Sequence, residues 1–220
     1  MAELHIRNTR NEDVSALIDL QQRVYPTIAP WSEARVLHQL EIFPQGQFVA
    51  LYGERIVGCA SSLVIRWDDW SDEHTWKEIT AGGTFDNHDP DGRTLYGAEV
   101  FVDPRLRGKR VGHRLYEARR ALCRRANLRR IIACGRLPGY QRYADQMSIE
   151  TYAKKVVWGD INDPVLGFQL AEGFRYCGVI ENYLPEDAES HGHASLIVWL
   201  NPHFNEARRT LARANDEETI

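Results

Sequence analysis

The stretch VFVDPRLRGKRVGHRLYEARRALCRR, residues 100–125, decides the fold of this chain. It begins as an apolar strand that ends at Pro104, and from Val111 its apolar residues recur every three or four positions, as in a helix. A strand, a glycine-containing turn and a helix bring unpaired backbone N–H groups and the positive end of the helix dipole together. This arrangement predicts an anion site, and phosphate is the anion that it suits best.

The turn itself supplies flexibility and charge. Gly108 and Gly112 let the backbone approach a ligand, while Arg107, Lys109 and Arg110 surround it with positive charge. No Gly-Lys-Ser/Thr follows the turn, which excludes a P-loop, and the pattern G-x-G-x-x-G of dinucleotide sites is absent. The sequence therefore indicates a phosphate-binding turn of another kind.

Composition limits the classes of protein to consider. The chain has 220 residues, of which 43% are hydrophobic and 26% charged, as expected of one globular domain. Its amino terminus is polar and no run is long enough to span a membrane, so we expect a cytoplasmic protein. The four cysteines are widely spaced, and His191 and His193 have no third ligand nearby, so neither disulfides nor a metal site is predicted.

Hydrophobic periodicity predicts alternating strands and helices along the chain. Strands are expected in residues 3–10, 47–67 with a turn at Gly53-Glu54, 94–104, 128–136, 175–184 and 193–200. Helices are expected in residues 11–25, 32–43, 110–127, 148–159 and 163–174, with Ser148 and Asp163 as capping residues. The order predicts an α/β (α+β) domain over residues 1–203, followed by a charged tail or terminal helix at 204–220.

Positive charge is concentrated in residues 105–130, which contain eleven of the arginines and lysines. Such a cluster suits a phosphate-bearing ligand or nucleic acid, and it also suits a solvated helix face. The apolar stripe of Val111, Leu115, Ala118 and Leu122 requires the helix to dock on a core, so only its other face could meet a phosphate backbone. A nucleic-acid-binding module is therefore the weaker interpretation.

Two motifs resemble the GNAT superfamily of acyl-CoA-dependent N-acetyltransferases. That family's pyrophosphate loop reads Arg/Gln-x-x-Gly-x-Gly/Ala at the start of a long helix, after a strand that ends in Val-x-Pro. Residues 102–104 match the strand end, and Arg107 and Gly112 match the ends of the loop motif. Arg110 stands where the family has its first glycine, a departure that adds a cation beside the phosphates.

The second motif lies downstream, where Asn162 precedes a helix and then Gly173-Phe174, as is frequent in that family. The opening residues 4–21 are also similar, so the resemblance covers nearly the whole chain, with 135–159 longer than the usual connection. LPGYQRYAD, DPVLGFQLAEGF and ENYLPED resemble the acetyltransferase domain that some bacterial proteins carry fused ahead of a carbon–nitrogen hydrolase. No second domain of that kind fits in this chain.

The resemblance implies a single domain with a twisted mixed central sheet, flanked by helices, which opens beside residues 100–102 to receive acetyl-CoA. Its implied contacts are the backbone of Phe101 and Val102 and the side chain of Asn162 for pantetheine, and Arg107, Gly108, Lys109, Arg110, Val111 and Gly112 for pyrophosphate. The implied activity is direct transfer of an acetyl group to an amine acceptor, either a small molecule or a peptide. A homodimer is left open.

The same resemblance makes Glu99, on the strand before the loop, the candidate base that takes the proton of the amine. The alternative is a strand carboxylate paired with an arginine. The tyrosine that often serves as the acid falls on Gln169, which cannot donate a proton, and Tyr140, Tyr143 and Tyr183 are not ranked as substitutes. The acid is left unassigned, and a catalytically silent acyl-CoA sensor or partner subunit stays as an alternative function.

Residues 135–159 form the candidate acceptor site. They leave a strand that should border the cleft and return at Asn162, and they carry Tyr140, Tyr143 and Asp145, side chains suited to a polar amine. The alternative is a surface excursion whose helix covers one edge of the sheet. Acceptor identity cannot be read from the sequence.

Overall fold

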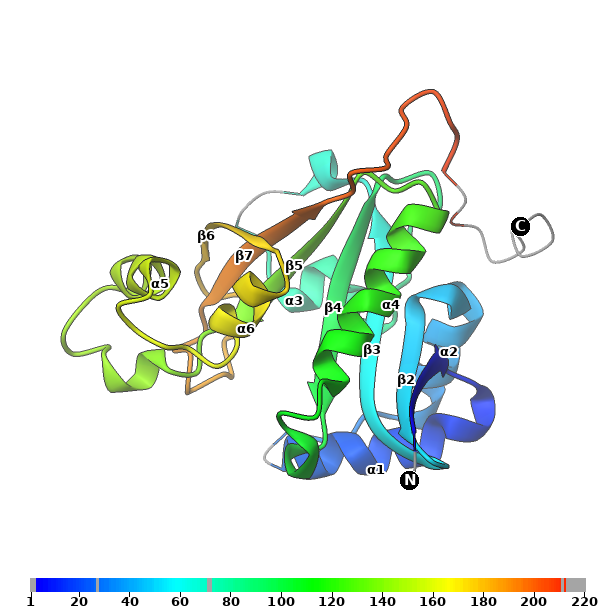
Figure 1. The fold of residues 1–220 in the computed structure, drawn as a ribbon, viewed down its shortest axis with the longest axis horizontal. Helices are drawn as coiled ribbons and strands as arrows, with labels where there is room; N and C mark the ends of the chain where they lie inside the picture. Colours follow the sequence, from blue (N-terminus) through cyan, green and yellow to red (C-terminus); the bar gives the residue numbers. More distant parts are fainter. Residues whose placement is uncertain (1–2, 27, 71–72, 211, 213–220) are drawn as a thin grey trace.

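The computed structural model describes residues 3–26, 28–70, 73–210 and 212. One sheet of seven strands, in the order β1-β2-β3-β4-β5-β7-β6, runs through the molecule, with helices on both faces (Figure 1). Neighbouring strands are antiparallel except β4 and β5, which are parallel. The predicted α/β fold with one mixed central sheet is confirmed.

The elements follow the periodicity of the sequence. The strands are β1 Leu4–Asn8, β2 Gln47–Tyr52, β3 Arg55–Ile65, β4 Thr94–Val102, β5 Arg130–Arg136, β6 Arg175–Ile180 and β7 Ala194–Leu200. The α-helices are α1 Val14–Val24, α2 Glu33–Ile42, α3 Trp76–Ile79, α4 Val111–Arg125, α5 Ile149–Trp158 and α6 Leu166–Ala171. Short 3-10 turns include η4 Ala81–Gly83, η5 Pro104–Leu106 and η6 Tyr140–Arg142.

The predicted capping residue Ser148 is the N-cap of α5, whereas α6 begins at Leu166 with Val165 as its N-cap and Asp163 two residues earlier. The hydroxyl of Ser148 accepts a hydrogen bond from the backbone N–H of Thr151 at 3.3 Å. Asp163 Oδ1 accepts from the backbone N–H groups of Val165 and Leu166, both at 2.9 Å. These acceptors satisfy N–H groups that the first helical turn leaves unpaired, so each helix begins close to the predicted residue.

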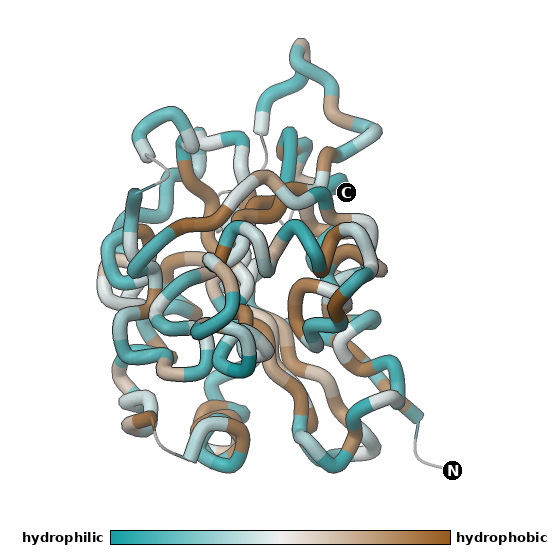
Figure 2. Tube along the Cα trace, turned by 90° about the vertical axis from the view of Figure 1, so that its left-hand side faces the viewer, coloured by the Kyte–Doolittle hydropathy of each residue, from teal (hydrophilic) through white to brown (hydrophobic). Residues whose placement is uncertain are grey.

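Two apolar layers lie on opposite faces of the sheet. Helix α4 buries Val111, Leu115 and Leu122 on one face, and helices α1 and α2 pack on the other against alternate strand residues such as Val49 and Phe101. In Figure 2, hydrophobic residues gather along the inner strands, while the outer loops are largely hydrophilic. No helix within the described residues is both long and apolar enough to span a membrane.

Strands β4 and β5 separate halfway along β4. Residues 94–97 pair with residues 130–133, and no pairing joins the two strands beyond Gly97 and Ala133 in the described chain. Strand β3 stays paired with β4 as far as Val102, although the register shifts at Ser61 and Ser62. The extra residue of this β-bulge is Ala98, so the sheet opens beside residues 98–102.

The described segment that follows β7 contacts Asn127, which lies just after the end of α4. The side-chain amide of Asn127 donates to the carbonyl oxygens of Asn205 and Arg208, both at 2.9 Å, and its oxygen accepts from the N–H of Asn205. Residues 204–210 contain no helix, and Ala212 is buried. Residues 211 and 213–220, also assigned to the predicted tail, lie outside the described residues.

Candidate functional site

The open half of β4 presents unpaired backbone groups to the gap. The N–H of Asp103 donates to the carbonyl oxygen of Val57 in β3 at 2.8 Å. Because peptide groups alternate between the two edges of a strand, those of Val100 and Val102 point away from β3. Both residues lie beyond the last pair with β5. The N–H of Val100 donates to Glu99 Oε1, so the gap is lined by the carbonyl oxygens of both residues and the N–H of Val102, which can bind an extended amide chain.

Asp103 fixes the start of the turn that follows β4. Its buried carboxylate accepts from the backbone N–H of Arg105 at 3.1 Å and pairs with the guanidinium groups of Arg105 at 2.7 Å and Arg55 at 2.5 Å. Hydrogen bonds from Arg105 hold the pKa of this carboxyl well below its usual range. The turn is therefore anchored to β3 through Arg55.

Five backbone N–H groups converge where α4 begins. Those of Gly108, Arg110, Val111, Gly112 and His113 donate to no acceptor among the described residues, and the first α-helical bond runs from the N–H of Arg114 to Arg110 O at 3.1 Å. Arg110 adopts the left-handed conformation, with φ of 61°, that glycine would favour. The arginine in place of the family glycine therefore keeps the shape of the loop.

Charge around this turn is positive. Arg107, Lys109 and Arg110 are exposed and form no ion pair with any residue that the structure describes. Free N–H groups, the helix dipole and these three cations together form an anion site at the end of the open strand.

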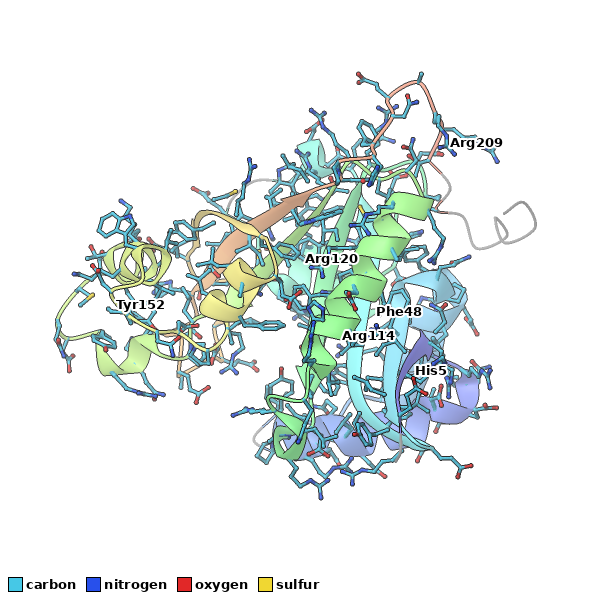
Figure 3. All side chains as sticks on the ribbon, viewed as in Figure 1. His5, Phe48, Arg114, Arg120, Tyr152 and Arg209 are labelled. Atoms are coloured by element: carbon cyan, nitrogen blue, oxygen red, sulfur yellow. The ribbon has the colours of Figure 1, made fainter. Side chains whose placement is uncertain are left out.

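The rest of the basic cluster is divided among other roles. Arg119 is buried, Arg120 pairs with Glu172 at 3.1 Å, and Arg124 lies over the ring of Trp199. Figure 3 places Arg120 on the side of α4 that faces α6. The cluster is therefore not one continuous basic surface, which weakens the nucleic-acid interpretation further.

Helix α6 is held against the first turns of α4. His113 Nδ1 lies 2.9 Å from Glu172 Oε1, and a Cβ added to Gly112 would meet the ring of Phe168 at 3.1 Å. The missing side chain of Gly112 thus serves helix packing as well as any ligand. Asn162 is exposed, and its amide oxygen lies 3.5 Å from a Cβ built on Gly167.

Glu99 lies on the α1/α2 face of β4, opposite the helix α4. Its Oε1 accepts from the hydroxyl of Tyr25 at 3.4 Å and from the backbone N–H of Val100 at 3.2 Å. Burial raises the pKa of Glu99, while the Val100 N–H and the charges of Arg35 and Arg136 partly oppose that rise. Glu99 as a residue is partly exposed, and a carboxylate with raised pKa in such a place is a candidate functional group.

A buried arginine supports the bulge that carries Glu99. Arg119, 1% exposed, donates from Nη2 to the carbonyl oxygens of Glu99 at 2.7 Å and Ser61 at 2.9 Å, and from Nε to Ser62 Oγ at 3.0 Å. Burial lowers the pKa of Arg119. Since these bonds join β3 to β4 across the bulge, they fix the backbone at the point where the sheet opens.

The candidate acceptor segment folds mainly on itself. Tyr140 is buried and donates to the carbonyl oxygen of Met147 at 3.2 Å, the ring of Tyr143 lies 5.5 Å from that of Tyr152, and Asp145 is exposed. In Figure 1, α5 lies beyond α6 as seen from α4. No hydrogen bond, ion pair or ring contact within the described chain joins these three residues to Glu99.

Gln169, which stands at the position of the usual acid, and Tyr183, one of the three unranked tyrosines, are both buried. Gln169 donates from Nε2 to the hydroxyl of Tyr116 at 3.4 Å, and its Oε1 has no hydrogen-bond partner in the described chain. The hydroxyls of Tyr183 and Tyr96 lie 2.5 Å apart. Burial raises the pKa of Tyr116 and Tyr183, and no contact ranks either as the acid.

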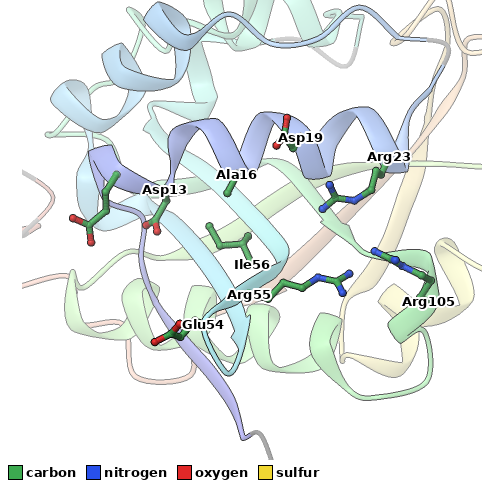
Figure 4. Close-up of a pocket in the computed structure, with 9 residues that line it drawn as sticks. Asp13, Ala16, Asp19, Arg23, Glu54, Arg55, Ile56 and Arg105 are labelled. Atoms are coloured by element: carbon green, nitrogen blue, oxygen red, sulfur yellow. The ribbon is translucent and has the colours of Figure 1, made fainter.

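A separate open groove of about 590 Å³ lies between α1 and the turn that joins β2 to β3 (Figure 4). Its lining mixes both charges, including Asp13, Asp19, Arg23 and Arg55. Asp13 pairs with Arg7, Arg55 pairs with Asp103, and none of the lining residues belongs to β4. The groove therefore does not form part of the site at the open strand.

Sequence reasoning missed Tyr25, which follows α1 and hydrogen-bonds to Glu99, and Arg35 of α2 and Arg136 of β5, whose charges act on Glu99. No local pattern marks them, because they meet only when the sheet forms. Arg119 did leave a signal, since it stands between Leu115 and Leu122 on the apolar stripe of α4. A charged residue at such a position indicates a buried polar role.

Comparisons with known proteins agree with this geometry. The model of the acetyltransferase (GNAT) family matches residues 14–144. "Uncharacterized N-acetyltransferase YkwB" of Bacillus subtilis (strain 168) is 36% identical over 208 residues, which cover 93% of this chain and 92% of that protein. "Probable hydrolase YhcX" of the same organism is 45% identical over 196 residues, or 89% of this chain.

This chain spans only 38% of the length of YhcX, which agrees with the predicted resemblance to an acetyltransferase domain fused to a hydrolase. Among solved structures, "GphF GNAT-like decarboxylase in complex with isobutyryl-CoA" matches with a TM-score of 0.74 and 27% identity, covering 90% of this chain and 99% of that one. Relatives of this fold thus include one that binds an acyl-CoA.

Proposed function

Because the chain belongs to the GNAT acetyltransferase family, we propose that it transfers an acetyl group from acetyl-CoA to an amine acceptor. Pantetheine lies along the open edge of β4, with the backbone of Val102 and the side chain of Asn162 as contacts. The backbone groups of Phe101, a further contact implied by the family resemblance, face β3 and do not line this edge. Pyrophosphate binds at residues 107–112. The acyl-CoA complex of GphF, which is 27% identical, supports the choice of cofactor.

The chemistry needs a base more than it needs an acid. The amine nitrogen attacks the thioester carbonyl, the new N–C bond forms, the C–S bond breaks, and the proton of the amine passes to Glu99 directly or through water. CoA leaves as a thiolate, and a thiol with a pKa of about 8.5 is a tolerable leaving group without a proton donor. The raised pKa of Glu99 brings it closer to the pH at which it must accept a proton.

The five unpaired N–H groups beside the open strand carry this proposal. Isothermal titration of the protein with acetyl-CoA tests it, together with a free-thiol release assay against a panel of amines. Arg107→Glu should weaken acetyl-CoA binding about tenfold or more, because it places a negative charge beside the pyrophosphate. Arg23→Glu, an equal charge change on the exposed face of α1, is the matched control. Equal affinities in both variants would contradict the site.

The similarity to the GphF decarboxylase supports a second candidate function, the decarboxylation of a carboxylated acyl-CoA. In that reaction the bond from Cα to the carboxyl group of a carboxylated acyl-CoA breaks and CO₂ leaves. The electron pair stays as the thioester enolate, and Cα takes a proton from water. Release of CO₂ from malonyl-CoA without any amine would support decarboxylation, whereas thiol release that depends on an amine supports acyl transfer.

A further inference from the structure

One arginine on the α1/α2 face of β4 has no carboxylate partner. Arg35, on α2, places its Cζ 5.3 Å from the ring centroids of both Trp31 and Trp76. Its Nε donates to the carbonyl oxygen of Gly83 at 3.2 Å. It forms no ion pair with any residue that the structure describes, and its terminal Nη atoms donate no hydrogen bond there.

Both rings that hold Arg35 are attached to the strand that carries Glu99. Trp31 packs edge-on against Phe101, with ring centroids 5.6 Å apart, and Trp76 Nε1 donates to the carbonyl oxygen of Ala98 at 2.9 Å. These contacts bracket Glu99 in the sequence of β4. The charges of Arg35 and Glu99 also act on one another, since each favours the ionised form of the other.

The other cations near Glu99 are already satisfied. Arg136 pairs with Asp187 and, at 2.8 Å, with Glu189, while Arg119 donates to three neutral acceptors of β3 and β4. A guanidinium stacked between aromatic rings keeps its N–H groups directed outward in its own plane, where rings cannot accept them. Arg35 is thus the cation at this site that retains capacity for a ligand.

We propose that Arg35 binds a carboxylate of the substrate beside the reacting carbonyl, which rests on the proposed placement of acyl-CoA along β4. Nε is hydrogen-bonded to Gly83, so the edge formed by the two Nη atoms is the one left to bind a carboxylate through two parallel hydrogen bonds. That carboxylate belongs either to an amino acid acceptor or to the acyl chain of a dicarboxylic acyl-CoA. In both cases it lies close to Glu99 without pairing with it.

The turn η4 positions this guanidinium. Gln39 Nε2 donates to the carbonyl oxygen of Gly83 at 2.6 Å, and a Cβ added to Gly83 would lie 2.5 Å from Arg35 Cζ. Gly83 therefore leaves room for the guanidinium to lie flat on the backbone. Gly82, its neighbour, has a similar positive φ of 69° but nothing within 4 Å of an added Cβ.

Matched probes separate the two sources of the carboxylate. The first arm compares L-lysine with cadaverine, L-tyrosine with tyramine and L-phenylalanine with phenethylamine as acceptors of acetyl groups. The second arm compares the affinities of malonyl-CoA and acetyl-CoA. We expect the carboxylate-bearing member to be favoured in one arm, and Arg35→Gln to reduce that preference by about 10- to 100-fold. Arg35→Lys should fall between, and Arg23→Gln should change nothing.

Two glycine variants test the placement of Arg35 apart from its charge. Gly83→Ala should displace the guanidinium and reduce the same preference, whereas Gly82→Ala bears the same backbone strain and should keep it. Two results would overturn this inference alone. In one, the protein binds acetyl-CoA but shows no preference for the carboxylate-bearing probe in either arm. In the other, Arg35→Gln weakens the use of both members of a probe pair equally. A protein that binds no acyl-CoA would overturn the proposed function with it.

Discussion

The two faces of the open half of β4 are built in different ways. On the side of α4, the anion site consists of backbone N–H groups and cations from one continuous stretch, residues 107–113. On the α1/α2 side, Glu99 meets Tyr25 and Arg35, which lie more than sixty positions away in the sequence. The difference indicates that the proposed cofactor binding rests on local backbone shape, whereas the proposed chemistry rests on contacts that only the folded sheet creates.

The largest expected effect concerns Glu99. Glu99→Gln should lower turnover by roughly a hundredfold or more, because the amide cannot accept the proton of the amine. Acetyl-CoA affinity, measured by calorimetry, should change little, because the anion site lies on the other face of the strand. Loss of acyl-CoA binding in a folded Glu99→Gln variant would contradict this, because it would show that Glu99 and the anion site belong to one binding site.

The pH dependence provides a control for this variant. Burial raises the pKa of Glu99, and a base works only when deprotonated, so kcat/KM should rise with pH through that raised pKa. Activity should fall as the pH drops below it. Glu99→Gln should lack this acidic limb, and an unaltered pH–rate profile would remove Glu99 from the mechanism.

The next effect concerns Arg119, the positioning residue beneath the bulge. Arg119→Met should destabilise the fold by about 1–3 kcal/mol, because it leaves the buried carbonyl oxygens of Ser61 and Glu99 without this donor. Turnover should fall about tenfold as the bulge relaxes. Thermal unfolding and kcat measure both effects.

The pH profile separates positioning from stability alone. Loss of a positive charge near Glu99 should move the acidic limb of Arg119→Met to higher pH. Arg120→Met is the comparison, because Arg120 contacts Glu172 of the α6 region and does not touch β4. An acidic limb that stays in place would leave Arg119 with a structural role only.

These two faces also explain what the sequence could predict. The succession of strands and helices around β4 and the stripe of Val111 and Leu115 follow from local periodicity, and the structure confirms them. Ser148 and Asp163 are predicted from residue type, and both accept backbone hydrogen bonds near the starts of α5 and α6. The partners of Glu99 could not be found, because α1 and α2 reach β4 through tertiary packing, in which Trp31 and aliphatic residues such as Leu17 cluster with Phe101. Contacts of this kind depend on which face each strand residue occupies after the bulge, and a single sequence does not specify a bulge.

Two glycines on the α4 side are expected to have smaller effects on acetyl-CoA affinity, for different reasons. Gly112→Ala should disturb the packing of α4 on α6, because its Cβ would lie 3.1 Å from the ring of Phe168. Gly108→Ala meets no atom within 4 Å, yet it places an alanine at φ of 76°, which costs about 1 kcal/mol. We expect acetyl-CoA affinity to fall a fewfold in each. Affinity lost with Gly112→Ala alone would assign the effect to α6.

The smallest expected effect concerns residues 135–159, the other candidate for the acceptor site. The hydroxyl of Tyr140 is used within the segment, Tyr143 packs on Tyr152, and Asp145 is exposed. If the acceptor instead lies on the α1/α2 face, Tyr140→Phe, Tyr143→Phe and Asp145→Asn should each leave the KM of the acceptor within about twofold. Steady-state kinetics with the acceptor found in the amine panel measure this, and the Kd of acetyl-CoA serves as the control. A rise in the KM of the acceptor in both Tyr143→Phe and Asp145→Asn, with an unchanged Kd of acetyl-CoA, would place the acceptor against this segment. A surface excursion that only covers the edge of the sheet could not change acceptor binding without also changing the fold.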